Sequence, residues 1–162
     1  MNDKIMFGVS TSSYQIEGAV HEDGRTDCIW DTYSKEFGNI LNGDTGEDAC
    51  DHYHRYREDI GLIRELGADI YRFSISWNRI YPEKDRYNPS GMAFYRNLLK
   101  ELKEKEIKAC VTIYHWDLPQ WAQNLGGWEN RECVAWYLQF AEKLFEELDD
   151  DVSMWITHNE PY

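Results

Sequence analysis

The sequence has few basic residues and no long hydrophobic run, and each shortage excludes a class of protein. Lys and Arg total 17 against 30 Asp and Glu, which gives a net charge of −13. So acidic a chain argues against nucleic acid or an anionic membrane surface as a partner. No apolar run approaches the roughly 18 residues that a membrane-spanning helix needs. We therefore expect no nucleic acid and no membrane among its partners.

Cysteines are also scarce, and they form no recognisable framework. The spacing of the four includes no CxxC pair and matches no set of disulfides: Cys28, Cys50, Cys110 and Cys133. The segment after Met1 is polar and then strand-like, which is not the pattern of a secretory leader. The simplest expectation is a reduced, cytoplasmic protein.

Two histidines close to Cys50 raise the question of a metal site. Cys and His side chains bind zinc in many proteins, and Cys50, His52 and His54 lie close together in the chain. His52 and His54 are two positions apart near a helix start, so they do not share a face. We expect these residues to cap, pack and anchor a loop, and we expect neither a metal nor an organic cofactor.

Aromatic residues, by contrast, are abundant, with 7 Trp and 11 Tyr in 162 residues. This load suits stacking against flat ligand faces such as sugars, and it equally suits an aromatic-rich core. The length is sufficient for one domain with a hydrophobic core, but a complete α/β barrel needs about 250 residues. No Gly-rich phosphate loop is found in the sequence.

The hydrophobic periodicity alternates between strand-like and helix-like segments. Apolar runs at 5–13, 69–76, 109–115 and 152–157 predict four strands. Three stretches between them repeat at three- and four-residue steps and predict amphipathic helices: Tyr53, Tyr56, Ile60 and Ile63; Tyr95, Leu98, Leu99 and Leu102; Val134, Tyr137, Leu138, Ala141, Leu144, Phe145 and Leu148. Segment 23–48, rich in Gly, Asp and Asn, predicts a long ordered loop. This order predicts one α/β domain with a parallel sheet.

Polar side chains follow each predicted strand. The carboxyl ends of parallel strands meet at one edge of a sheet, so residues far apart in the chain should gather there. The gathered residues are Gln15, Arg72, His115, Trp116, Asn159 and Glu160. Their amide, imidazole and indole groups suit the hydroxyls of a pyranose better than a phosphate or an apolar ligand.

Strand geometry predicts where several of these side chains, and two apolar ones, should lie. Arg72 is expected on the interior side of its strand, where a structural pair with a nearby Asp or Glu is the alternative to a catalytic role. Strict alternation puts Asn159 and Glu160 on opposite faces, so both reach one site only if the strand is irregular at 158–161. Val111 and Ile113 are expected on the inner face of the sheet.

The motifs resemble those of glycoside hydrolase family 1, the retaining β-glucosidases and their relatives. Thr157-His-Asn-Glu-Pro161 is similar to the family signature Thr-x-Asn-Glu-Pro. Further motifs resemble the family in its order: Ser12-Ser-Tyr-Gln-Ile-Glu-Gly-Ala19, Ile29-Trp-Asp31, Asp51-His-Tyr-His54, Tyr71-Arg-Phe-Ser-Ile-Ser-Trp77, Tyr114-His-Trp-Asp-Leu-Pro-Gln120 and Gly126-Gly-Trp128. The resemblance implies a (β/α)8 TIM barrel, of which residues 1–162 form the N-terminal half. This half covers roughly the first four strands and three helices, with no second domain.

The resemblance also implies a reaction and site roles. Glu160 would be the general acid/base in the release of terminal non-reducing β-D-glucosyl residues from a β-glucoside or oligosaccharide. Arg72 would pair with the nucleophile, which in the family lies beyond the region matched by this chain. The implied glycone-binding residues are Gln15, His115, Trp116 and Asn159. The isolated chain is then expected to be inactive and to self-associate or be complemented by the C-terminal half.

Other interpretations remain open at this stage. A 6-phospho-β-glycosidase is one alternative, since its phosphate-binding basic residues would be expected beyond the region that residues 1–162 cover. A non-catalytic sugar-binding module would have no need of Glu160, and a truncated gene product would have no function of its own. His158 departs from the family, which usually has an apolar residue there, so it is expected to alter the packing beneath Glu160 or its protonation.

Overall fold

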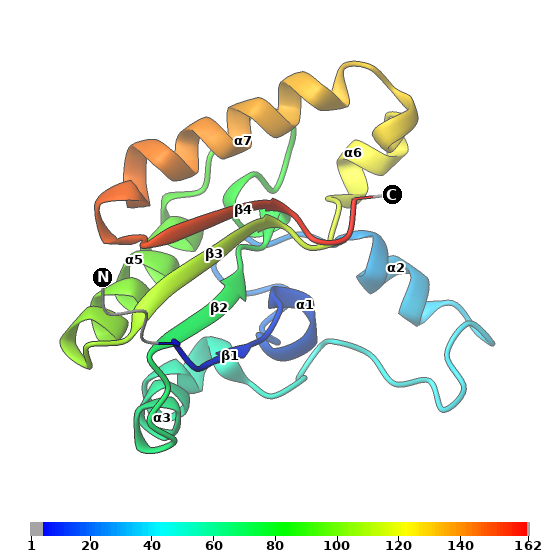
Figure 1. The fold of residues 1–162 in the computed structure, drawn as a ribbon. Coiled ribbons are helices and arrows are strands. Elements are labelled where there is room, and N and C mark those ends of the chain that lie inside the picture. The colour runs from blue at the N-terminus through cyan, green and yellow to red at the C-terminus, as the bar shows by residue number, and fades with distance from the viewer. Residues whose placement is uncertain (1–4, 162) are drawn as a thin grey trace.

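The computed structural model describes residues 5–161, and their strands form one four-stranded parallel sheet. The strands pair in chain order (Figure 1): β1 (Gly8–Ser10), β2 (Ile70–Ser74), β3 (Lys108–Tyr114) and β4 (Met154–His158). The register aligns Ser10 with Arg72, Arg72 with Cys110 and Cys110 with Met154. The parallel sheet predicted from the alternation of elements is therefore confirmed.

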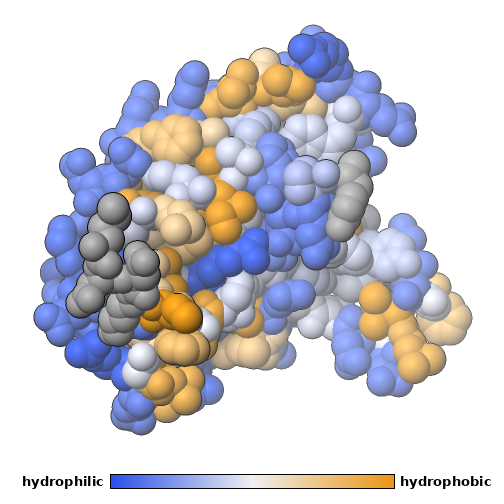
Figure 2. All heavy atoms as spheres, in the orientation of Figure 1, coloured by the Kyte–Doolittle hydropathy of each residue, from blue (hydrophilic) through white to orange (hydrophobic). Residues whose placement is uncertain are grey.

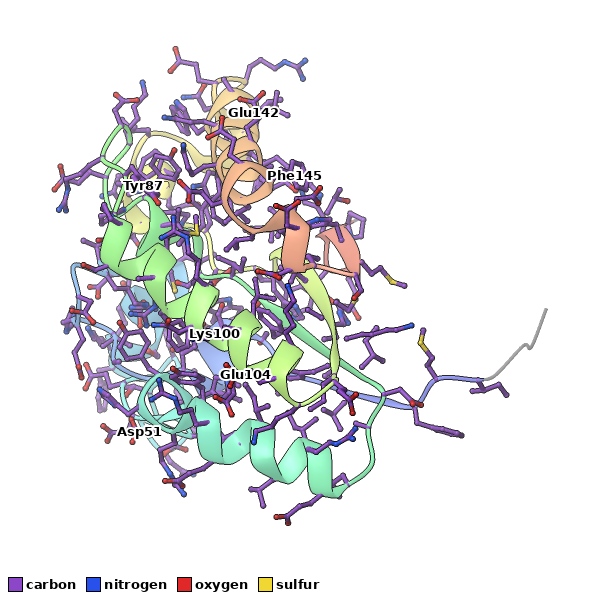
Figure 3. All side chains as sticks on the ribbon, turned by 90° about the vertical axis from the view of Figure 1, so that its left-hand side faces the viewer. Asp51, Tyr87, Lys100, Glu104, Glu142 and Phe145 are labelled. Carbon is purple, nitrogen blue, oxygen red and sulfur yellow. The ribbon has the colours of Figure 1, made fainter. Side chains whose placement is uncertain are left out.

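Three long helices connect the strands and cover one face of the sheet: α3 (His52–Glu65), α5 (Pro89–Glu104) and α7 (Cys133–Leu148). Figure 3 shows the three helices side by side. Pro89 stands in the first turn of α5, where its missing N–H removes no helical bond. Gly67 ends α3 at φ 75°, a left-handed conformation that glycine adopts at little cost. The three predicted helices are confirmed.

The core lies between the sheet and these helices, and it is rich in aromatic rings. Trp77 stacks on Phe140 of α7 with ring centroids 5.2 Å apart and an interplanar angle of 2°. Val111 and Ile113 belong to this core, with 0% and 1% of their surfaces exposed. The expectation that they lie on the inner face of the sheet, which is the face without helices, is wrong. Every residue of β3 after Lys108 is buried, so its hydrophobic pattern does not distinguish the two faces.

Short helices surround the carboxyl ends of the strands. They are α1 (Ser13–Ile16), α2 (Ile29–Lys35), α4 (Trp77–Ile80) and α6 (Gln120–Asn124), and a 3-10 turn follows at Gly127–Glu129. A second 3-10 turn, Asp149–Asp151, lies at the opposite end of the sheet, between α7 and β4. The predicted loop 23–48 thus contains α2. After α2 the chain extends away from the body (Figure 1), with Phe37 and Leu41 exposed.

Within residues 5–161 no helix covers the opposite, open face of the sheet, although the β3 residues on it are themselves buried. Figure 2 looks onto this side and shows hydrophobic patches around hydrophilic residues. The outer side of α7 is also uncovered: Val134, Leu138 and Phe145, which were expected in the packed stripe, are 38%, 51% and 41% exposed. None of the helices within 5–161 combines the length and apolar character needed to cross a bilayer.

Candidate active site

Three of the six predicted rim residues line a cavity of about 260 Å³ beyond the carboxyl ends of β1 and β3. Gln15, His115 and Trp116 line it, and Ser12, Tyr14 and Trp30 complete the wall. The sequence did not single out Tyr14 and Trp30 for this role. Their ring centroids are 6.3 Å apart, and the Tyr14 hydroxyl donates to the Trp30 carbonyl at 3.2 Å. The cavity therefore joins one aromatic wall to amide and imidazole groups.

Gln15 lies in α1, a single turn that is anchored at both ends. At its start, the backbone N–H of Ser13 donates to Ser74 Oγ at 2.8 Å. Just after it, the buried carboxylate of Glu17 accepts bonds from Tyr95 Oη at 2.6 Å and Arg79 Nε at 3.2 Å. A buried ion pair of this kind holds its partners firmly, because breaking it would leave an uncompensated charge. The exposed Gln15 side chain thus projects from a fixed support.

His115 and Trp116 follow directly from the last residue of β3. Burial lowers the pKa of His115 below its ordinary value, the charge of Arg72 lowers it further, and Glu160 opposes this. The imidazole is therefore neutral at neutral pH, and its buried Nδ1 has no partner within the described residues. The Trp116 indole N–H donates to the Asn159 carbonyl at 3.0 Å, and 42% of the residue is exposed. Its N–H is thus already bonded within the chain, and Trp116 lines the cavity.

Arg72 crosses the open face of the sheet toward the end of β4. Its Nε donates to Thr112 Oγ1 at 3.1 Å and its Nη2 to Asn159 Oδ1 at 2.7 Å. Among residues 5–161 it has no ion pair with a carboxylate, so the structural pair considered as an alternative is not found in the described region. The guanidinium instead fixes the amide of Asn159.

The end of β4 is irregular, as expected for 158–161. The strand ends at His158, and Glu160 has φ 46°, in the left-handed region that non-glycine residues seldom adopt. The Asn159 N–H still bonds the Tyr114 carbonyl at 3.0 Å, while the Glu160 side chain is exposed. This break in alternation allows Asn159 to meet Arg72 while Glu160 remains at the rim.

His158 packs into an aromatic group beneath this break. Its ring centroid is 4.7 Å from Tyr137, 5.8 Å from Tyr114 and 5.9 Å from Trp128. Desolvation by these rings lowers the pKa of His158. The neutral imidazole therefore occupies the place of an apolar side chain.

The histidines beside Cys50 have structural contacts. His52 Nδ1 lies 2.6 Å from Asp59 Oδ2, and His54 bridges Asp51 at 2.5 Å and Glu22 at 2.9 Å. Within the described part of the chain, no group of three or more His, Cys, Asp or Glu is arranged to hold a metal ion. The His52–Asp59 contact lies within α3, and His54 links the start of α3 to Glu22 in the preceding loop.

Comparison with known proteins shows close relatives of greater length. Beta-glucosidase A of Acetivibrio thermocellus is 50% identical over 157 residues, covering 96% of this chain and 35% of that protein. Beta-glucosidase A of Thermotoga maritima is 52% identical over 158 residues, covering 97% and 35%. The chain spans about a third of the length of these relatives.

Solved structures show the same relationship. The GH1 beta-glucosidase from Exiguobacterium antarcticum B7 superposes with a TM-score of 0.97 at 56% identity, over 99% of this chain and 36% of that one. The Thermotoga maritima beta-glucosidase in complex with deoxynojirimycin gives a TM-score of 0.96 at 51% identity, over 99% and 37%. The four strands correspond to the first strands of a TIM barrel. The profile of the family described as Glycosyl hydrolase family 1 matches residues 1–162, and the chain belongs to that family.

Proposed function

We propose that this chain is the acid/base-bearing part of a retaining β-glucosidase that releases terminal non-reducing β-D-glucosyl residues. The observation that supports this most is that side chains suited to bonding a sugar gather at one edge of the sheet. Gln15, His115 and Trp116 line one cavity, and Asn159 and Glu160 adjoin it through the Trp116–Asn159 bond. Because the chain spans about a third of its relatives, its activity requires the remainder of a barrel.

Glu160 is proposed to act as both acid and base. In the first step its carboxyl gives a proton to the glycosidic oxygen as the bond from that oxygen to C1 breaks, and a second carboxylate bonds C1. In the second step the Glu160 carboxylate takes a proton from water as the water oxygen attacks C1 and displaces that carboxylate. The exposure of Glu160 at the rim suits exchange of protons with substrate and water.

The second carboxylate is proposed to approach Arg72. A retaining enzyme needs its two carboxyl groups about 5–5.5 Å apart. Arg72 bonds only uncharged oxygens of Thr112 and Asn159 within residues 5–161, which leaves its charge available to such a group. A cation at this place would keep the nucleophile ionised.

Complementation tests the proposal. The chain is co-expressed with a second polypeptide carrying the remaining part of a family 1 barrel, and the purified complex is assayed on an aryl β-glucoside. We expect turnover with retention at C1, followed by proton NMR, and no turnover by either polypeptide alone. An assembled complex that is inactive, inverts C1 or prefers a 6-phosphoglucoside would contradict the proposal.

A further inference from the structure

Asp117 is a buried carboxylate that directly follows His115 and Trp116. Only 1% of its surface is exposed, and it accepts a bond from Ser13 Oγ at 2.6 Å on Oδ2. Its other oxygen, Oδ1, is buried without a partner in the described structure. A buried charged carboxylate is costly unless hydrogen bonds or an ion pair compensate it, and burial raises the pKa of Asp117 to about 6. The reaction proposed above makes no use of this group.

Ser13 extends the contact to a third strand. Its backbone N–H donates to Ser74 Oγ at 2.8 Å, and Ser74 Oγ donates in turn to Ser13 Oγ at 3.2 Å. Both serines are buried, with 3% and 1% exposed. Ser74 is the last residue of β2, Ser13 opens α1 after β1, and Asp117 lies in the loop after β3. One carboxylate and two hydroxyls therefore join the ends of three strands.

We call the bonded residues Ser13, Ser74 and Asp117 the junction. The backbone next to Asp117 and next to Ser13 shows which residues the junction holds in place. Trp116 has φ 72°, a conformation that is unfavourable for an aromatic residue and persists only when its surroundings fix it. The Asp117 bond holds the chain immediately after that residue. Gln15 stands two positions after Ser13 and lines the same cavity as Trp116.

We propose that Asp117 is a positioning residue, which through Ser13 fixes Gln15 relative to His115 and Trp116 across the sugar cavity. It touches no substrate itself. The inference rests on the proposed function for its kinetic consequence, but the geometric claim concerns this chain alone. A rigid pair of loops matters because a displacement of about 1 Å at a catalytic site can cost about 10²-fold in rate.

The kinetic test is a double-mutant cycle in the complemented enzyme. We expect Asp117→Ala to lower kcat/KM for an aryl β-glucoside by up to about 10²-fold. In a Gln15→Ala background the same change should cost a smaller factor, because one of the residues that Asp117 positions is absent. Asp117→Asn keeps an oxygen for Ser13 and should recover activity to within about tenfold of the parent. Equal costs of Asp117→Ala in both backgrounds would overturn the inference.

Asp31 provides the matched control. It is also a buried carboxylate, bonded to Arg25 Nη2 and to the Cys28 N–H, each at 2.8 Å, and it makes no bond to Ser13. Asp31→Ala should reduce stability but cost the same factor in kcat/KM with or without Gln15. A general loss of stability would make Asp117→Ala behave in the same way.

Hydrogen exchange measured by mass spectrometry tests the geometry without any activity. In the chain alone, Asp117→Ala should speed exchange in peptides covering 12–17 and 114–119, whereas Asp31→Ala should act on 25–36. Unchanged exchange in the first two segments, or the same pattern for both variants, would refute the junction. If complementation yields no turnover, the proposed function fails while this measurement still decides the inference.

Discussion

Arg72 Nη2 donates to Asn159 Oδ1 at 2.7 Å, joining β2 to the end of β4 across 87 residues of sequence. Arginine has donors and no acceptor, so the atom of Asn159 that faces it must be the oxygen. The amide nitrogen of Asn159 is then left as a donor. We propose that this donor bonds the 2-hydroxyl of the sugar, a bond that strengthens in the transition state.

Asn159→Asp should separate these two roles. The aspartate keeps an oxygen for Arg72 but lacks the amide donor, so the fold should be retained while glucoside hydrolysis by the complemented enzyme falls. A bond of about 1.5–3 kcal/mol corresponds to a loss of about tenfold to 10²-fold in kcat/KM. A 2-deoxyglucoside, which lacks the hydroxyl, should lose much less. Equal losses on the two substrates would remove Asn159 from the 2-hydroxyl.

Gln15→Ala should weaken discrimination between sugars. An amide that bonds a hydroxyl rejects stereoisomers that leave it unpaired, so its removal narrows the gap between them. In the complemented enzyme we expect lower kcat/KM for glucosides and galactosides and a smaller ratio between the two. Tyr33→Phe, outside the cavity that Gln15 lines, is the control. Unchanged rates and an unchanged ratio would exclude Gln15 from the site.

His158 should make the chain less stable in acid. Its pKa is lowered in the folded state by desolvation, so between that value and about 6.5 the unfolded chain binds more protons. Stability is therefore lost as the pH falls below about 6.5. His158→Phe should reduce the difference between urea midpoints measured at about pH 7.5 and about pH 5.

His54 serves as a control of opposite sign. Asp51 first, and then Glu22, raises its pKa, so its contribution is present in acid and lost as the pH rises through its folded pKa. His54→Gln should enlarge the acid-side loss of stability. If His158→Phe leaves the pH dependence unchanged, the imidazole is not desolvated among the rings.

The sequence predicts the alternating elements and the rim residues because both follow local rules of periodicity and strand direction. Prediction from the sequence fails where contacts between distant residues determine the local structure. α2 was missed within 23–48 because its seven residues are too few for a clear period, although Asp31 accepts the Cys28 N–H in a capping box. The Ser13–Asp117 bond joins residues 104 apart, and nothing in the local pattern indicates it.

The chain alone should self-associate and show no glycosidase activity. The outer edges of β1 and β4 pair with no other strand in the described structure, and such edges template association. Leu138 and Phe145 expose an apolar side of α7 beside β4. We expect size-exclusion chromatography to show dimers or larger species, and Leu138→Glu with Phe145→Lys to shift them toward monomer. A monomeric wild-type chain that hydrolyses an aryl β-glucoside would contradict both expectations.

We propose that Glu160 supplies the proton to the leaving group, and the dependence of the rate on the leaving group tests this role most directly. The complemented enzyme and its Glu160→Ala variant are compared on an alkyl β-glucoside and on a dinitrophenyl β-glucoside, whose leaving group needs no proton. General acid catalysis contributes about 10²–10⁴-fold, so the alkyl substrate should lose about that factor in kcat/KM. The dinitrophenyl substrate should lose less than about tenfold. Equal losses on both substrates would show that Glu160 is not the acid.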